Sequence, residues 1–273
     1  AAMLAPAVPA GAHPQPRRDP RPATSAEVIG GNVLFGGLIA AGRALFTDAD
    51  PLRAFAIGAL GGAVYLAGKN LAVEPGAANA WAGLVLASTG TAVVANAGRG
   101  VHPLAELSLP LASARLRVTP FGARKIRFAV NLLETAVIIQ HSVTDGVEID
   151  WDRSLGSGSV VFFAQEKRIL LDGEEYGGFA VAPTVLISTF VPDTARMIRH
   201  EVVHVHQQWF LHESVGRPIE AALRKRLKFA RYVPKWLEIG LVAPGLLAFE
   251  NWASRGNGMK QVLEAEAERL ERR

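Results

Sequence analysis

Three long apolar stretches near the start of the chain constrain its fold more than any other feature. They cover residues 30–46, 54–73 and 77–97 and are rich in Gly and Ala. A helix needs about 20 mainly apolar residues to cross the hydrocarbon core of a bilayer, and each stretch comes close to that length. Gly58 and Gly62 stand four residues apart, a spacing that lets helices pack closely in lipid. The pattern therefore predicts apolar helices that associate with membrane lipid.

Two charged residues inside these stretches leave a second interpretation open. Arg43 and Lys69 interrupt the first and second stretches, and Gly and Ala replace much of the Leu, Ile and Phe of ordinary spanning helices. The alternative to a spanning region is a buried helical hairpin in a soluble or peripheral domain. Basic residues flank both ends of the first two stretches, so counting them does not give an orientation.

Residues 1–29 are rich in Ala and Pro and contain a small basic cluster. Their prolines exclude a continuous helix and predict an extended arm. The first residue is Ala, which we interpret as processing after a signal peptide or as removal of Met alone. We therefore expect a bacterial inner-membrane location with periplasmic exposure. The arm is a candidate contact with other subunits of a membrane complex.

The composition excludes several kinds of chemistry. The chain has no Cys, which rules out a disulfide scaffold, Cys-ligated metal and a thiol nucleophile. Its net charge of +4 is small, and no face interleaves basic and aromatic residues, so we expect no nucleic-acid partner. Phosphate-loop, dinucleotide and Ser-nucleophile motifs are absent from the sequence. Any metal site must therefore use His, Asp or Glu ligands.

A change of hydrophobic period near residue 111 marks a second region. Apolar and polar residues alternate over 114–118, as in a half-buried strand. Thr144-Asp145-Gly146 is a hairpin-type turn between two further strand candidates. A small antiparallel sheet is predicted within 111–190. Its other strands are expected at 136–143, 147–151, 159–163, 168–171 and 179–188.

Helices are predicted again after Pro192. Asp193 is a suitable N-cap for a helix that runs to about His212, with Gly216 and Pro218 as stop signals. Two more helices are expected at about 219–232 and 259–273.

These patterns together predict an α+β protein in three parts. The first is the arm at 1–29, and the second is the apolar helical region at 30–100. The third is an α+β domain at 101–273, in which the sheet occupies 111–190 and the helices that carry the site occupy 193–273.

The strongest chemical signal is the H-E-x-x-H motif formed by His200, Glu201 and His204. Residues four apart lie on one helical face, so both imidazoles can reach the same ion. Glu201 is placed to contact a water molecule at that ion without binding the metal itself. The non-functional interpretation is a pair of surface histidines beside a salt-bridging Glu. We expect His206 and His212 to be surface residues or to contact the metal ligands without binding the metal themselves.

Zinc in a hydrolytic site needs a third protein ligand and an open position. The motif together with Glu264-Ala265-Glu266-Ala267-Glu268 resembles the gluzincin metallopeptidases, particularly the membrane-associated CAAX-protease and HtpX-like peptidases, over about residues 179–271. The resemblance implies a zincin-like C-terminal part with Glu264 as the third zinc ligand. It also implies that Glu268, in place of the family's Asp, orients a zinc-bound histidine. Glu266 is an alternative ligand, and a solvated helix end is the non-functional interpretation.

The resemblance also implies a peptide or protein substrate. In such peptidases the substrate binds as an added strand, through main-chain hydrogen bonds. The candidate binding strand lies just before the motif, at residues Ala180, Val181, Ala182, Thr184 and Val185.

The function expected from these residues is zinc-dependent peptide hydrolysis at a membrane. Zinc activates water, and Glu201 acts as the general base. Tyr232 and His212 are both candidates for stabilising the oxyanion. The alternative is a non-catalytic accessory subunit of a photosynthetic, respiratory or secretion complex that retains a peptidase-like domain.

Overall fold

The fold is taken from a computed structural model. It describes residues 23–122, 125–144, 146–165, 169–171, 174–181, 183–227, 232–234, 236–238, 240 and 259–272. Most of the predicted arm, Asp145 of the predicted turn and Ala182 of the predicted substrate strand lie outside these residues.

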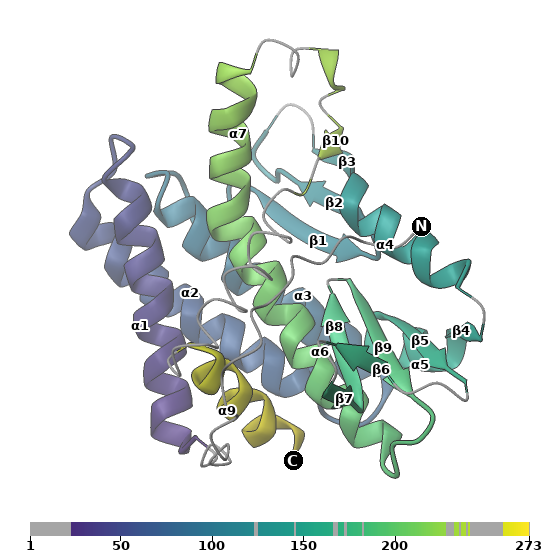
Figure 1. The fold of residues 1–273 in the computed structure, drawn as a ribbon. Coiled ribbons are helices and arrows are strands. Elements are labelled where there is room, and N and C mark those ends of the chain that lie inside the picture. Colours follow the sequence, from purple (N-terminus) through teal and green to yellow (C-terminus); the bar gives the residue numbers. More distant parts are fainter. Residues whose placement is uncertain are drawn as a thin grey trace, which may run out of the picture.

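The three apolar stretches form an up-and-down bundle of helices (Figure 1). Helix α1 begins at Ser25 because Thr24 and Glu27 form a capping box, in which each side chain satisfies a backbone N–H of the other residue. The predicted arm boundary at residue 29 was therefore wrong. Each helix has the length and apolar composition needed to cross a membrane. The bounds are Ser25–Ala44 for α1, Pro51–Ala72 for α2 and Ala77–Ala97 for α3.

Glycine allows the backbones of this bundle to come into direct contact. A Cβ atom on Gly36 would lie 2.5 Å from the carbonyl oxygen of Gly58, so no larger residue fits without moving the helices apart. The predicted small-residue spacing thus marks a real helix contact, between α1 and α2.

The described residues after the bundle form two four-stranded sheets and a two-stranded one (Figure 1). The first sheet has the order β1-β2-β3-β10, with strands Leu107–Leu111, Ala114–Val118, Ile126–Asn131 and Leu237–Glu238. The second has the order β4-β5-β9-β8, with strands Val147–Asp150, Val160–Ala164, Thr184–Ser188 and Gly178–Val181. Strands β6 (Ile169–Leu171) and β7 (Glu174–Tyr176) form the third.

The prediction of a single antiparallel sheet was wrong in two respects. The strands divide between sheets, and β3 pairs with β10, and β5 with β9, in parallel. Strand β9 is buried at all five positions and lies inside its sheet, between β5 and β8. The predicted strand at 179–188 is in fact the β8–β9 hairpin.

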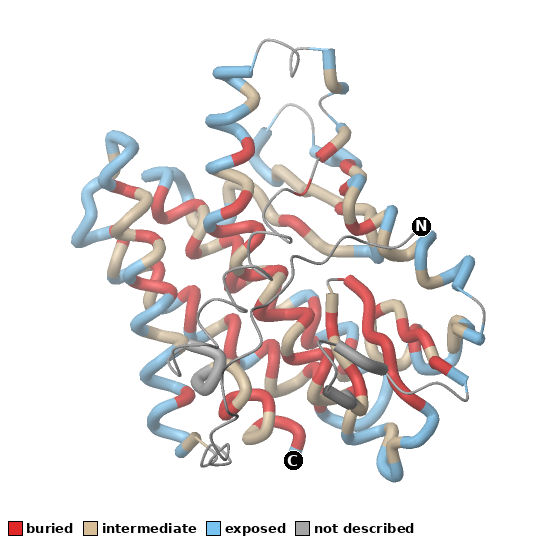
Figure 2. Tube along the Cα trace, in the orientation of Figure 1, coloured by how far each residue is buried: buried red, intermediate tan, exposed pale blue. Residues whose placement is uncertain are grey.

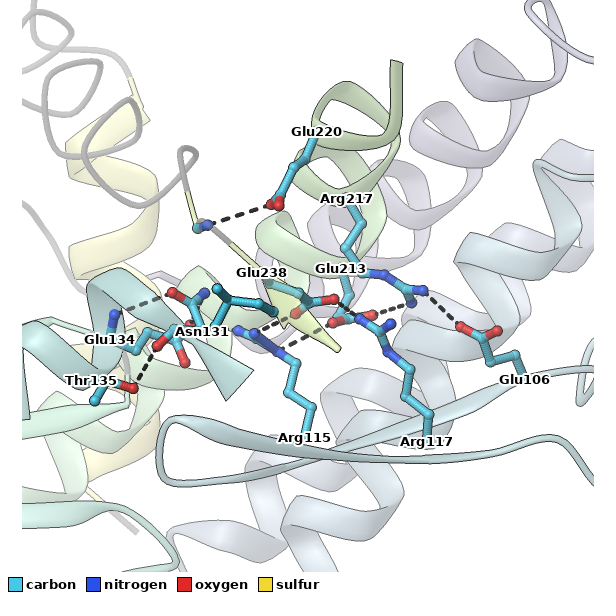
Figure 3. A network of polar contacts seen from close by, with 12 residues as sticks. Glu106, Arg115, Arg117, Asn131, Glu134, Thr135, Glu213, Arg217, Glu220 and Glu238 are labelled. Carbon is cyan, nitrogen blue, oxygen red and sulfur yellow. Dashed lines mark hydrogen bonds and ion pairs between the residues drawn. The ribbon is translucent and has the colours of Figure 1, made fainter. Parts of the chain in front are cut away.

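One predicted strand, at 136–143, is instead helix α4, Leu132–Ser142. Asn131 caps this helix by accepting a hydrogen bond from the Glu134 N–H. The Glu134 carboxylate is buried and pairs with Arg115 at 2.5 Å (Figure 3). A tertiary ion pair therefore anchors the helix start, and a short apolar run alone does not reveal such a pair. A second short helix, α5, covers Trp151–Ser157.

Helix α6, Thr194–Leu211, lies between the bundle and the second sheet (Figures 1 and 2). Its N-cap is Asp193, as predicted. Near its end Phe210 packs on Tyr65 of α2, while Val202 packs against the sheet.

The helical structure does not end with α6. It continues through the π-helical turn His212–Gly216 into α7, Arg217–Arg226. Pro218 was predicted to end a helix, but it lies in the first turn of α7, where its missing N–H costs no hydrogen bond. The last helix, α9, covers Met259–Glu271.

Candidate metal centre

Two helices from distant parts of the chain bring three potential ligands together. Helix α6 contributes His200 and His204, and α9 contributes Glu264. The His200 and His204 Nε2 atoms are 3.1 Å apart. The Glu264 Oε2 atom lies 3.2 Å from the first and 3.5 Å from the second. The three ligands predicted from the sequence thus meet at one point.

These spacings suit a single small cation. Zinc binds nitrogen and oxygen ligands at about 2.0–2.2 Å, and tetrahedral geometry then separates neighbouring ligand atoms by about 3.3 Å. The three observed separations fall close to that value. Two imidazoles with one glutamate also form the donor set of known catalytic zinc sites that keep an open position. The residues present therefore fit zinc.

Hydrogen bonds behind the rings fix the direction in which each histidine points. His200 Nδ1 lies 3.0 Å from Glu271 Oε2, so this nitrogen carries the hydrogen. His204 Nδ1 donates to Gln207 Oε1 at 2.8 Å. The amide orientation of Gln207 is set in turn because its NH2 group faces the Glu266 carboxylate at 2.8 Å. Both Nε2 atoms therefore face the shared point.

The partner of His200 is a residue that the sequence analysis missed. Glu268, predicted for this role, has Arg272 as its ion-pair partner among the described residues. On a helix of 3.6 residues per turn, a residue seven positions after Glu264 lies about 20° from it, whereas one four positions after lies about 40° away. Glu271 could have been found from this spacing. Its second oxygen accepts from Arg196 at 2.6 Å, which holds the carboxylate in place.

Glu266, the alternative ligand, is part of a different structure. Its carboxylate is buried and pairs with Lys69 of α2 at 2.5 Å. It also accepts a hydrogen bond from Asn32 of α1 at 2.6 Å. Positive charge and hydrogen bonding keep the pKa of Glu266 low although burial acts to raise it. Glu266 thus ties α9 to the apolar bundle, and it reaches His204 only through Gln207.

Glu201, the predicted general base, lies on α6 beside the first ligand and is 5% exposed. Burial raises the pKa of its carboxyl, although the neighbouring His204 and His200 favour the charged form.

The three ligand side chains form one electrostatic unit. Burial alone would lower the pKa of His204, but the hydrogen bond to Glu264 together with the negative charges of Glu201 and Glu264 outweighs it, and the pKa rises to about 9. For Glu264 burial opposes ionisation, yet the hydrogen bonds from both histidines hold its pKa far below the usual range. The unit therefore favours a carboxylate beside positive charge, which is also the situation that a bound cation creates.

The other histidines of α6 and its extension are not surface residues. His206 is buried, and burial together with the charge of Lys69 lowers its pKa to about 4. His212 is also buried, and burial together with the charge of Arg115 lowers its pKa to about 3. His212 follows His204 by eight residues, which is about 12 Å along a helix, so it lies away from the ligands. Tyr232 is 75% exposed.

The predicted substrate strand divides into two parts with different environments. Ala180 and Val181 belong to β8, which lies at the edge of its sheet. Thr184 and Val185 belong to the buried central strand β9. Strands pair with β9 on both sides, so those two residues cannot accept an added peptide strand. Gln208 of α6 donates to the Ala180 carbonyl at 2.9 Å, which connects β8 to the helix with the ligands.

No protein-family model, curated protein or solved structure matches this chain.

Proposed function

We propose that the protein is a membrane-associated zinc metallopeptidase. The observation that carries the proposal is the convergence of His200, His204 and Glu264 at separations suited to one zinc ion, with Glu201 beside them. A bound zinc ion would supply Lewis acidity, which polarises a carbonyl and makes water a better nucleophile.

The chain's own residues account for the remaining steps. His200 and His204 direct their Nε2 atoms toward the shared point because Glu271 and Gln207 occupy the opposite nitrogens. The Glu201 carboxylate accepts a proton from the attacking water and returns it to the leaving amine. Burial of Glu201 favours acceptance of the proton, since a carboxylate shielded from solvent holds a proton more readily than an exposed one.

The substrate would bind along β8. An edge strand offers unpaired backbone groups to an extended peptide, and β8 lies against α6. A peptide that pairs with β8 would take the place of Gln208 at the Ala180 carbonyl, and it would run beside the helix that carries the candidate ligands.

Membrane association is supported by the outer face of α1 and α2, defined here as Ile29, Leu34, Phe35, Leu38, Ala56, Leu60, Ala63 and Ala67. All eight residues are exposed and uncharged. Large exposed apolar patches are rare on soluble monomers and mark contact with a protein or a membrane. The length and composition of the helices favour a membrane.

The test uses the full chain purified in detergent. We expect about one zinc per chain and cleavage of quenched fluorogenic peptides by the unaltered protein. Glu201→Gln should reduce cleavage at least about a hundredfold, because it removes the general base, while zinc content and melting temperature stay unchanged. Glu268→Gln, the same substitution on a half-exposed Glu of α9, should keep full activity.

Zinc content, melting temperature and peptide cleavage also distinguish the proposal from the alternative of a non-catalytic subunit. Purified protein that holds no zinc, with a melting temperature insensitive to chelators, would disprove the metal site. Bound zinc without cleavage of any peptide would favour the non-catalytic subunit of a membrane complex.

A further inference from the structure

A polar cavity lies at the other end of the bundle, away from the candidate metal centre. It has a volume of about 410 Å³ and is enclosed by the ends of α1 and α3, strand β1, the π-helical turn and α7. Arg43 and Arg99 line it from the bundle, and Arg217 and Lys225 line it from α7. Four positive side chains therefore surround one space.

Only part of this positive charge is balanced within the described residues. Glu106 and Glu213 are the acidic residues of the lining. Arg217 bridges both of them at 2.8 Å, as Figure 3 shows. The remaining oxygens of these two carboxylates face Arg127 at 2.8 Å and Arg115 at 3.5 Å. Both acids are thus engaged by arginines other than Arg43 and Arg99.

Arg43, Arg99 and Lys225 remain without a carboxylate partner in the part of the chain that the structure describes. Arg43 experiences the like charges of Arg99 and Arg217 as well as the opposite charges of Glu213 and Glu106, which the other arginines already engage. Holding like charges near one cavity costs free energy unless an anion balances them.

The wall of the cavity offers hydrogen-bond donors as well. Ser88 of α3 and Ser108 of β1 both line the cavity, and they are 2% and 6% exposed. Neither hydroxyl has a hydrogen-bond partner among the described residues. Buried hydroxyls are normally paired, so two unpaired ones in a cationic cavity indicate a ligand with acceptor oxygens.

We propose that this cavity binds a phosphate-type anion, with Arg43, Arg99 and Lys225 supplying the positive charge and Ser88 and Ser108 supplying hydrogen bonds. A phosphate group fits this chemistry because it combines negative charge with several acceptor oxygens. The anion is either free phosphate or the headgroup of an anionic lipid. Arg99 and Lys225 are exposed and form the entrance, whereas the two serines lie deeper.

The first arm of the test measures phosphate binding to the full chain in detergent, by calorimetry at constant ionic strength against chloride. A chelator is present so that the metal centre does not contribute. We expect saturable binding that Arg99→Gln and Lys225→Gln each weaken roughly tenfold, since each removes a charge-assisted contact. Arg53→Gln is the matched control, because Arg53 is an exposed arginine of α2 at the same end of the bundle but outside the cavity lining.

The second arm identifies the source of the anion. It compares binding to phosphatidylcholine vesicles with and without phosphatidylglycerol. A preference for phosphatidylglycerol that depends on Arg99 and Lys225, without binding of inorganic phosphate, would identify a lipid headgroup. Binding of neither probe, or equal losses in Arg53→Gln, would overturn the proposal. Neither arm depends on peptidase activity, so the proposed function and the anion site can fail separately.

Discussion

The two candidate ligand histidines are supported by chemically different partners. His200 faces the Glu271 carboxylate, whereas His204 faces the neutral amide of Gln207. A carboxylate behind an imidazole makes the ring a stronger metal ligand than an amide does, because negative charge raises its basicity. We therefore expect Glu271 to increase metal affinity through His200, although it does not bind the metal itself.

Replacement of Glu271 tests this expectation. Glu271→Ala should weaken zinc binding about 10–100-fold, because His200 loses both its orientation and its charged partner. The measurement is zinc affinity by competition with a chelator. Glu268→Ala on the same helix is the control and should leave the affinity unchanged. Equal losses in both variants would show that the effect comes from the helix end in general.

His212 makes stability sensitive to acid. Its folded-state pKa of about 3 lies below the ordinary value of 6.5, because burial and nearby arginines disfavour the charged ring. The unfolded chain therefore binds a proton at a pH where the folded chain does not. The stability that this residue contributes is complete above pH 6.5 and is lost as the pH falls toward 3.

The expected result is a loss of about 1.4 kcal/mol of unfolding free energy per pH unit from His212 well below pH 6.5. His212→Phe keeps a ring of similar size and removes the titration, so unfolding by denaturant should depend less on pH in this variant. His102→Asn, at an exposed position, is the control. An unchanged pH dependence in His212→Phe would contradict the assignment.

Helix α9 is held in place by its contacts with two other parts of the fold. Ala267 and Leu270 pack against Val203 of α6 and Val73 at the end of α2. Glu266 adds the buried ion pair with Lys69 and the hydrogen bond from Gln207. The helix that supplies Glu264 is therefore positioned by the apolar bundle as well as by α6.

Breaking the buried ion pair should show this dependence. Lys69→Met leaves the Glu266 carboxylate without its cation in a buried site, and it should cost about 3–5 kcal/mol of unfolding free energy. The double variant Lys69→Met with Glu266→Met removes both charges and should recover most of this loss. Denaturant unfolding in detergent measures both. A double variant no more stable than the single one would show that the charges do not act as a pair.

The molecule as a whole has two unlike sides. The outer face of α1 and α2 is apolar, while the sheets lie on the other side of α6 (Figures 1 and 2). Lipid contact at the outer face would bury apolar area and contribute roughly 25 cal/mol per Å². The candidate metal centre lies where α6, α9 and the bundle meet, so the helices proposed to contact lipid also help to position the site.

Charges placed on the outer face test membrane attachment. The double variant Leu38→Glu with Leu60→Glu should lower binding to lipid vesicles in a flotation assay, because burying a carboxylate in lipid is costly. Leu155→Glu is the control, since Leu155 is 60% exposed but lies on α5. Equal binding by all three proteins would place the membrane contact elsewhere.

Local patterns predicted the elements and the candidate ligands that depend on residues close in sequence. The apolar stretches predicted three helices, and the capping residue Asp193 predicted the start of α6. The H-E-x-x-H spacing predicted that the two histidines lie together. Spacing within α9 also contained the signal for Glu271. These features follow from helical periodicity, which acts over one or two turns.

Other features depended on contacts between distant segments. The choice of helix for α4 follows from the Glu134–Arg115 pair, and the parallel pairing of β5 with β9 follows from the packing of a fully buried strand. The separation of roles between Glu264 and Glu266 has the same origin. Both lie on α9, two residues apart, and only the packing of that helix turns the first toward the histidines and the second toward Lys69. No local pattern specifies that direction, because it depends on which partners the folded chain brings to each side of the helix.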